Sequence, residues 1–165
     1  MKLLDQTQIN QKVRRLAIEI LENNYKETEL FFAGINNNGY EFAKLIKAAL
    51  RRRTKEVDIT LCRIKLNPAF PVKDPVELSL DQSELKGKVI ILVDDVANTG
   101  RTLFYAFKPL LEFLPKKVEV AVLVDRTHKT FPVKVDYMGI SLATTLKENI
   151  EVKIINVEEK EVHLA

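Results

Sequence analysis

Residues 89–102 read VIILVDDVANTGRT, and this stretch decides the fold. Five consecutive apolar residues suit a strand that is buried on both faces, as in a parallel sheet. The carboxylates Asp94 and Asp95 follow this strand, and after a small turn an apolar helix-like run begins at Thr102. The pattern therefore predicts a turn that connects a buried strand to the N-terminus of a helix.

The same turn has the chemistry of a sugar-phosphate site. Unpaired backbone N–H groups at a helix N-terminus hold anions, Gly100 permits a tight backbone, and Thr99 and Thr102 offer hydroxyl groups. Asp94 and Asp95 are acceptors for a vicinal diol and ligands for Mg²⁺. We therefore predict that the acids hold a ribose and that the turn holds its 5′-phosphate. The plainer alternative is an exposed acidic strand end followed by a Thr-rich turn.

Length and composition indicate one ordinary globular domain. A chain of 165 residues forms one domain with a real core and is too short for two. Hydrophobic residues make up 46% and charged residues 30%, which excludes a disordered or fibrous chain. No apolar run approaches the ~20 residues of a membrane span, and the first residues lack a signal-peptide core, so we expect a cytoplasmic protein. Cys62 is the single cysteine, which excludes an internal disulfide or a cysteine metal cluster.

The order of the expected elements indicates an α/β domain over residues 1–165. Apolar residues at helical spacing predict an amphipathic helix over residues 8–23 and a second helix over 40–52. Continuous or alternating apolar runs predict strands at 30–35, 57–61, 89–93 and 118–124, with shorter ones at 135–140, 150–157 and 161–164. Strands that alternate with helices predict a parallel sheet with right-handed crossovers. We expect the short C-terminal strands, about 150–164, to be an appendage that closes this sheet, and the last two can pair as a hairpin.

The pattern dissolves between residues 62 and 87. Pro68, Pro71 and Pro75 interrupt it, and Lys65, Lys73 and Asp74 favour solvent. Connections of this length without secondary structure are unusual in compact domains and often serve as lids over active sites. A lid, a disordered insertion and a β-hairpin packed on a neighbouring element all remain open.

The 89–102 segment closely resembles the phosphoribosyl-pyrophosphate (PRPP) loop of type I phosphoribosyltransferases. Residues 121–140, and the layout of the opening helix and first strand, are similar to the PyrR family of pyrimidine-operon attenuators and uracil phosphoribosyltransferases. The resemblance implies a type I phosphoribosyltransferase fold, in which helices flank a central parallel sheet and a mobile hood loop, here about 62–87, covers the site. It implies transfer of the 5-phosphoribosyl group from PRPP, bound with Mg²⁺, to a pyrimidine base. Uracil is the expected base, UMP and pyrophosphate the expected products, and a homodimer or higher homo-oligomer the expected assembly.

The resemblance also assigns residues. Asp94 and Asp95 are the expected catalytic residues. The expected contacts to the ribose and 5′-phosphate are Asp94, Asp95, Ala97, Asn98, Thr99, Gly100, Arg101 and Thr102. Asp125, Arg126 and His128 follow a later strand and border the expected base pocket. A surface ion pair and a solvated histidine are the alternative interpretation of those three residues.

One segment departs from the family pattern. The pyrophosphate loop after the first strand usually carries basic residues between two glycines, whereas here Gly34 is followed by Ile35, Asn36, Asn37, Asn38 and Gly39. Amides and loop N–H groups still bond a pyrophosphate, but charge-assisted hydrogen bonds are about twice as strong. Arg63, Lys65 or Lys73 from the hood, or a cation from a neighbouring subunit, could substitute. Weak or lost turnover and a plain asparagine turn are the alternatives.

A different class of function also stays open. An RNA-binding regulator of pyrimidine genes, with weak or no transferase activity, would use PRPP or a nucleotide only as an effector. The basic residues that could contact RNA are Lys12, Arg14, Arg15, Arg51, Arg52, Arg53 and Lys55. Such runs are usually solvated helix faces, and glutamates lie among them. A transferase for a purine or another base is permitted by the signature loop alone.

Overall fold

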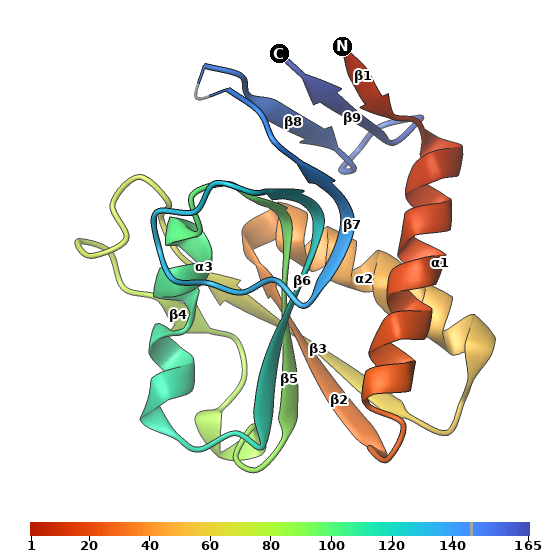
Figure 1. Cartoon of the computed structure of the whole chain (residues 1–165). Coiled ribbons are helices and arrows are strands. Elements are labelled where there is room, and N and C mark those ends of the chain that lie inside the picture. Colours follow the sequence, from red (N-terminus) through yellow and green to blue (C-terminus); the bar gives the residue numbers. More distant parts are fainter. Residues whose placement is uncertain (146) are drawn as a thin grey trace.

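Six strands form the central sheet of the computed structural model, which describes residues 1–145 and 147–165, and helices cover both faces of this sheet (Figure 1). The order across the sheet is β4-β3-β2-β5-β6-β7, and every neighbouring pair except β3 with β4 is parallel. The elements are β1 (Lys2–Leu4), α1 (Gln6–Asn23), β2 (Glu29–Ile35), α2 (Asn36–Arg53), β3 (Asp58–Lys65), β4 (Glu77–Leu78), η1 (Gln82–Glu84), β5 (Val89–Ala97), α3 (Arg101–Ala106), η2 (Lys108–Glu112), β6 (Lys117–Arg126), β7 (Tyr137–Leu142), β8 (Ile150–Lys153) and β9 (Glu161–Leu164). The predicted α/β class is confirmed.

The strand order reverses between β2 and β5. From β2 the chain continues outward through α2 to β3, whereas β5 is followed on its other side by β6 and β7. Gly34 pairs with Val93, so the carboxyl ends of β2 and β5 meet at one edge of the sheet. A crevice outside the strand ends at such a reversal is where open α/β sheets bind ligands.

Two apolar cores hold the sheet, and the β5 sequence serves both. Ile91 and Val93 pack into the core beneath α1 and α2, while Ile90 and Leu92 pack into the core beneath α3 and η2. This two-sided burial explains the uninterrupted apolar run at the start of the signature segment. The apolar face of α1 lies in the first of these cores, so it is a core face and not a free surface.

The C-terminal strands do not close the central sheet, which corrects that expectation. β8 and β9 form the predicted hairpin, but they join β1 in a separate antiparallel sheet of order β1-β9-β8, at the top of Figure 1. The strand expected at 150–157 ends at Lys153, because the chain turns at Asn156, whose φ is 52°. Strand β9 lies between β8 and β1, and β1 comes from the N-terminal end of the chain.

The 62–87 excursion has more structure than its sequence indicates. β3 continues through Lys65, and the short strand β4 pairs antiparallel with its end, Ile64 opposite Leu78. Within the next turn Asn67 donates a side-chain hydrogen bond to Asp74 (2.8 Å). The segment is therefore partly an added edge of the sheet. None of the helices in the described residues is long and apolar enough to cross a membrane.

Candidate active site

A cleft of about 420 Å³ lies at the carboxyl ends of β2 and β5. The β2–α2 turn lines one side and the β5–α3 turn lines the other, so the two predicted substrate loops face the same space. The lining residues are Ile35, Asn36, Asn37, Asn38, Pro68, Asp94, Asp95, Val96, Asn98, Thr102 and Ile150.

The β2–α2 turn is shorter than predicted. β2 runs through Ile35 and α2 begins at Asn36, whereas a loop was expected through Gly39 with the helix from Tyr40. Asn36 makes the turn alone, in the left-handed region at φ 52°, which asparagine tolerates better than most residues. Its side-chain oxygen accepts the N–H of Leu66 (3.0 Å) and ties the turn to the start of the hood. The three asparagines therefore form the first turn of a helix.

Two glycines bring this helical turn close to the sheet. A Cβ on Gly34 would lie 2.4 Å from Tyr40 Cα, and a Cβ on Gly39 would lie 2.5 Å from the carbonyl oxygen of Val93. Neither position has room for a side chain. The close approach lets the Asn38 amide donate a hydrogen bond to Asp95 Oδ2 (2.8 Å).

The two acids occupy different environments. Asp94 is buried, with 8% exposure, and its Oδ1 accepts the N–H of Asp95 (2.9 Å). Burial raises the pKa of Asp94 well above its usual range, and the neighbouring negative charge of Asp95 raises it further. Asp95 is half-buried, and its two oxygens accept from Asn38 and from the N–H of Val96 (2.9 Å). A ligand that donates hydroxyl groups to Asp94 would favour its ionised form.

The predicted turn between β5 and α3 lies at a helix N-terminus, and we call residues 97–102 the cradle. Gly100 lies at φ 85° and directly precedes α3, and the Thr99 hydroxyl accepts the N–H of Arg101 (3.3 Å). A cavity of about 40 Å³ lies within residues 96–103. The Thr99 carbonyl accepts the N–H groups of Thr130 (3.0 Å) and Phe131 (3.1 Å), so the loop after β6 braces the cradle from behind.

The hood contacts this cradle. The Arg101 guanidinium donates to the carbonyl oxygen of Pro68 (2.8 Å), and Pro68 also lines the cleft. The lid interpretation of the excursion thus has a physical basis, because one hood residue touches both the cleft and the cradle.

The donor set fits a Mg²⁺ ion that takes most of its ligands from substrate and water. No group of three His, Cys, Asp or Glu side chains is placed to hold a metal in the described part of the chain. Mg²⁺ commonly binds through one or two carboxylates plus substrate phosphates. Asp94 and Asp95 are the only two carboxylates among the residues that line the cleft.

The three residues expected at the base pocket separate in the structure. Asp125 is buried, pairs in register with Ala97, and forms an ion pair with Lys129. Arg126 donates to the Asn98 side chain (3.3 Å) and to the carbonyl of Thr145 (2.7 Å), which links it to the cradle. His128 is exposed. None of the three lines the cleft itself.

The hood cations expected to compensate for the asparagines lie outside the cleft lining. Arg63 stacks on the Tyr40 ring, 4.3 Å from its centroid, one helical turn beyond Asn36. Lys65 lines a neighbouring cavity of about 490 Å³ that shares Pro68 with the cleft. Lys73 lies near the Phe70 ring.

Sequence reasoning missed three residues of the cleft, Pro68, Val96 and Ile150. Ile150 comes from β8, and Pro68 was recognised only as an interruption of the pattern. An isolated proline and an isolated isoleucine carry no local signal for a binding site, since only long-range packing brings them there.

Comparison with known proteins agrees with this arrangement. Residues 2–162 match the family described as phosphoribosyl transferase domain. The chain belongs to this family. It is 35% identical over 167 residues to the bifunctional protein PyrR of Alkaliphilus metalliredigens, covering 96% of this chain and 91% of the relative. It is 32% identical over 159 residues to the protein of the same name from Haemophilus ducreyi, covering 92% and 88%. The PyrR-like identity expected from sequence is therefore confirmed, and the protein is a phosphoribosyltransferase.

Solved structures with lower identity share the fold. A hypoxanthine-guanine phosphoribosyltransferase from Bacillus anthracis superposes with a TM-score of 0.69 at 24% identity, covering 86% of this chain and 81% of that one. A hypoxanthine-guanine-xanthine phosphoribosyltransferase gives a TM-score of 0.66 at 19% identity, covering 86% and 78%. The type I phosphoribosyltransferase fold is thus confirmed.

Proposed function

We propose that this phosphoribosyltransferase transfers the 5-phosphoribosyl group of PRPP to a pyrimidine base, uracil, and forms UMP and pyrophosphate. The observation that carries the proposal is the meeting of the β2–α2 and β5–α3 turns around one cleft with Asp94 and Asp95 in its lining. The names of the PyrR relatives support the pyrimidine assignment.

The β5–α3 turn would hold the ribose 5-phosphate end. Asp94 and Asp95 accept the ribose hydroxyls, directly or through Mg²⁺, and the N–H groups of the cradle hold the 5′-phosphate. The hydroxyls of Thr99 and Thr102 add donors, and Ala97, Asn98, Gly100 and Arg101 complete the turn. Gly100 shapes it, because φ 85° directs successive N–H groups into one concavity.

The chemical difficulty is the charge that develops as pyrophosphate leaves. A cation-like centre forms at the ribose carbon, so the site must orient the ribose, bind the leaving group and exclude water. A Mg²⁺ ion bound with PRPP would supply charge neutralisation to the pyrophosphate. The buried Asp94 places negative charge near the ribose once a bound diol favours its ionised form.

The β2–α2 turn would hold the pyrophosphate. Asn37 is exposed at the cleft, whereas the side chains of Asn36 and Asn38 are already bonded to Leu66 and Asp95. Backbone N–H groups of the first turn of α2 and the Asn37 amide are therefore the donors on this side. They contribute no charge, so we expect weaker pyrophosphate binding than a basic loop would give.

The base would lie beyond the cradle, where Arg126 reaches Asn98. Arg126 is then a positioning residue for the base end of the site, acting with the braced loop after β6. Asp125 supports this loop through Lys129, and His128 lies at its exposed surface.

One assay tests the proposal directly. The protein is incubated with PRPP, Mg²⁺ and, separately, uracil, cytosine, hypoxanthine, guanine and adenine, and pyrophosphate release is measured. We expect release with uracil and formation of UMP. Release with a purine alone would overturn the base assignment, and lack of PRPP binding in calorimetry would overturn the site.

The alternative function is a PRPP- or nucleotide-responsive, RNA-binding regulator, and the name of the relatives, bifunctional protein PyrR, keeps it relevant. Two of its basic residues make hydrogen bonds to backbone carbonyls. Arg15 donates to the carbonyls of Met138 (3.0 Å) and Gly139 (2.7 Å), and Arg51 donates to that of Val57 (2.6 Å). Filter binding with RNA at two salt concentrations tests this role, because phosphate recognition requires affinity that falls with salt.

The assembly is a further part of the proposal. The family resemblance implies a homodimer or a higher homo-oligomer, and light scattering across a range of protein concentrations would measure the mass. A monomer at all concentrations would contradict it.

A further inference from the structure

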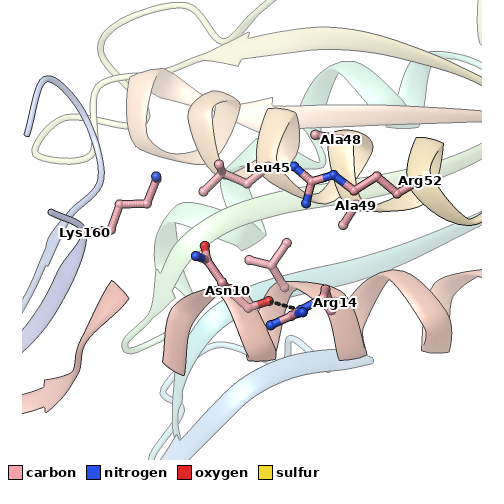
Figure 2. Close-up of a pocket in the computed structure, with 8 residues that line it drawn as sticks. Asn10, Arg14, Leu45, Ala48, Ala49, Arg52 and Lys160 are labelled. Atoms are coloured by element: carbon pink, nitrogen blue, oxygen red, sulfur yellow. Dashed lines mark hydrogen bonds between the residues drawn. The ribbon is translucent and has the colours of Figure 1, made fainter. Parts of the chain in front are cut away.

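A second cavity, of about 360 Å³, lies between α1 and α2 and shares no lining residue with the cleft. Its floor is formed by Val13, Leu45, Ala48 and Ala49. Asn10 and Arg14 from α1, Arg52 from α2 and Lys160 from the turn between β8 and β9 complete it (Figure 2). We call this cavity the interhelical groove.

Three cations from three different elements surround the groove. Figure 2 shows Arg52 on α2 and Arg14 on α1 at facing sides, with Lys160 reaching in from the β8–β9 turn. The backbone N–H of Lys160 bonds Gln6 Oε1 (2.9 Å), which fixes the position of this residue beside the start of α1. The three charges are thus placed by the fold, although they are distant from one another in sequence.

Among the described residues, these cations have no anionic partner. Within residues 1–145 and 147–165, the ion pairs involve other lysines and arginines, and no carboxylate is bonded to Arg14, Arg52 or Lys160. Within the part of the chain that the structure describes, the guanidinium groups of Arg14 and Arg52 make a single hydrogen bond, from Arg14 Nε to the carbonyl of Asn10 (3.4 Å). No acidic residue lines the groove. In a chain with 26 basic and 23 acidic residues, this local excess is a specific feature, and it favours an anion.

The apolar residues of the groove indicate that the ligand also has an apolar part. Val13 and Ala49 are buried, Leu45 is half-buried and Ala48 is exposed, and these four residues supply the apolar part of the groove lining. Pockets that bind small molecules combine such a lining with a few polar groups that fix orientation. Arginine recognises phosphate through paired hydrogen bonds, and an aromatic ring can lie on the apolar floor.

The geometry points to a second ligand site: the interhelical groove binds a nucleoside monophosphate, with the phosphate between Arg14, Arg52 and Lys160 and the base on the Val13–Ala49 floor. A single nucleotide suits the groove better than an RNA strand, because the three cations and the apolar residues line one bounded cavity of about 360 Å³, within the size range of small-molecule pockets. The site is separate from the transfer reaction, so it stands whether or not uracil is the base.

Backbone amide NMR tests this site with AMP, GMP and UMP as separate probes and adenosine as the probe without phosphate. We expect saturable shifts at residues 10–14, 45–52 and 160 with at least one nucleotide, distinct from shifts at the 97–102 cradle. Adenosine should leave the groove unshifted. Groove amides that respond to none of the nucleotides, or equally to adenosine, would overturn the proposal.

A pair of double variants assigns the charges. Arg14→Gln with Arg52→Gln should weaken the groove affinity by roughly tenfold or more, since charge-assisted bonds to phosphate are lost, and should leave the cradle shifts intact. Lys12→Gln with Arg53→Gln removes the same charge from the same helices outside the groove, and should retain the affinity. An equal loss of groove affinity in both double variants would mean that only the overall positive charge matters, and would contradict a specific phosphate site.

Two further measurements guard against other occupants. Groove shifts produced by a single-stranded RNA oligomer, but by no mononucleotide, would replace the proposed ligand with RNA. Groove amides that change with protein concentration, together with a rise in mass by light scattering, would show that a second copy of the chain covers the groove. Either result overturns the nucleotide site, and neither affects PRPP binding at the cleft.

Discussion

Asn38 donates its side-chain amide to Asp95 across the candidate active site, at 2.8 Å. This bond joins the two substrate turns, since Asn38 lies in the first turn of α2 and Asp95 at the end of β5. A lysine or arginine at position 38 would form an ion pair with the same carboxylate. The neutral amide instead orients Asp95 without compensating its charge, which leaves the full negative charge for a ribose hydroxyl or a metal.

A cationic side chain that would bind pyrophosphate is missing from the β2–α2 turn, and it can be introduced at Asn37. This residue is exposed at the cleft and has no side-chain hydrogen bond among those found in the described residues, so Asn37→Lys adds a charge without breaking a contact. We expect the KM for PRPP and the inhibition constant of pyrophosphate to fall roughly tenfold, because charged hydrogen bonds are the stronger ones. Asn37→Gln controls for side-chain length. Unchanged pyrophosphate inhibition in the lysine variant would contradict this placement of the leaving group.

The buried Asp94 predicts opposite effects on stability and binding. Because its folded-state pKa is raised above the ordinary aspartate value of 3.8, the folded state holds a proton that the unfolded chain has already lost. The contribution of this group to the free energy of unfolding therefore falls as pH rises above 3.8 and through the folded-state pKa. Asp94→Asn removes that loss, so its stability relative to the original protein should increase with pH across this window. Urea unfolding at a series of pH values measures the difference.

The same substitution should weaken PRPP binding, because Asn offers a single neutral acceptor to the ribose. In the unsubstituted protein, PRPP binding should release a proton from Asp94, since donated hydroxyls favour the carboxylate. Calorimetry in two buffers of different ionisation enthalpy detects this release. Equal proton release by Asp94→Asn would assign the proton to the phosphates of PRPP instead.

Gly100 and Gly87 form a matched pair for the cradle. Both have positive φ, 85° and 71°, so alanine at either position should cost about 1–2 kcal/mol of stability through backbone strain. A Cβ at Gly100 would lie 3.3 Å from the Phe131 carbonyl oxygen, whereas a Cβ at Gly87 meets nothing within 4 Å. We expect PRPP affinity to fall in Gly100→Ala alone. Equal PRPP affinities in the two variants would argue against the cradle as the 5′-phosphate site.

The base end of the site is tested at Arg126 and His128. Arg126→Gln removes the links to Asn98 and Thr145, so the KM for uracil should rise by roughly tenfold while the KM for PRPP changes less. His128→Gln changes an exposed side chain and should alter neither constant by more than about twofold. A larger effect at His128 than at Arg126 would reverse this assignment. Steady-state kinetics with each substrate varied in turn gives both constants.

The central sheet and the signature turn could be predicted from sequence because their determinants are local. The apolar run before Asp94 requires burial on both faces, and the helical spacing of Ile9, Val13 and Leu16 requires one buried helix face. The family resemblance rests on the same local segments. These features need no knowledge of what the rest of the chain does.

The remaining features depend on contacts between distant residues. β1 has three residues, too few for a periodic pattern, and it exists because Leu4 pairs with Val162. The start of α2 was misplaced because a single left-handed residue, Asn36, replaces the expected loop. Ile150 reaches the cleft only through the small second sheet, and the interhelical groove requires a lysine from the far end of the chain.

The two N–H groups that converge on the Thr99 carbonyl give the cradle a built-in reporter. The amide protons of Thr130 and Phe131 can exchange with deuterated water only when their hydrogen bonds to that carbonyl break. Their exchange rates therefore measure how often the bend behind the phosphate opens. An unlabelled substrate that tightens the bend would slow both rates together, so binding can be followed from within the protein's own backbone.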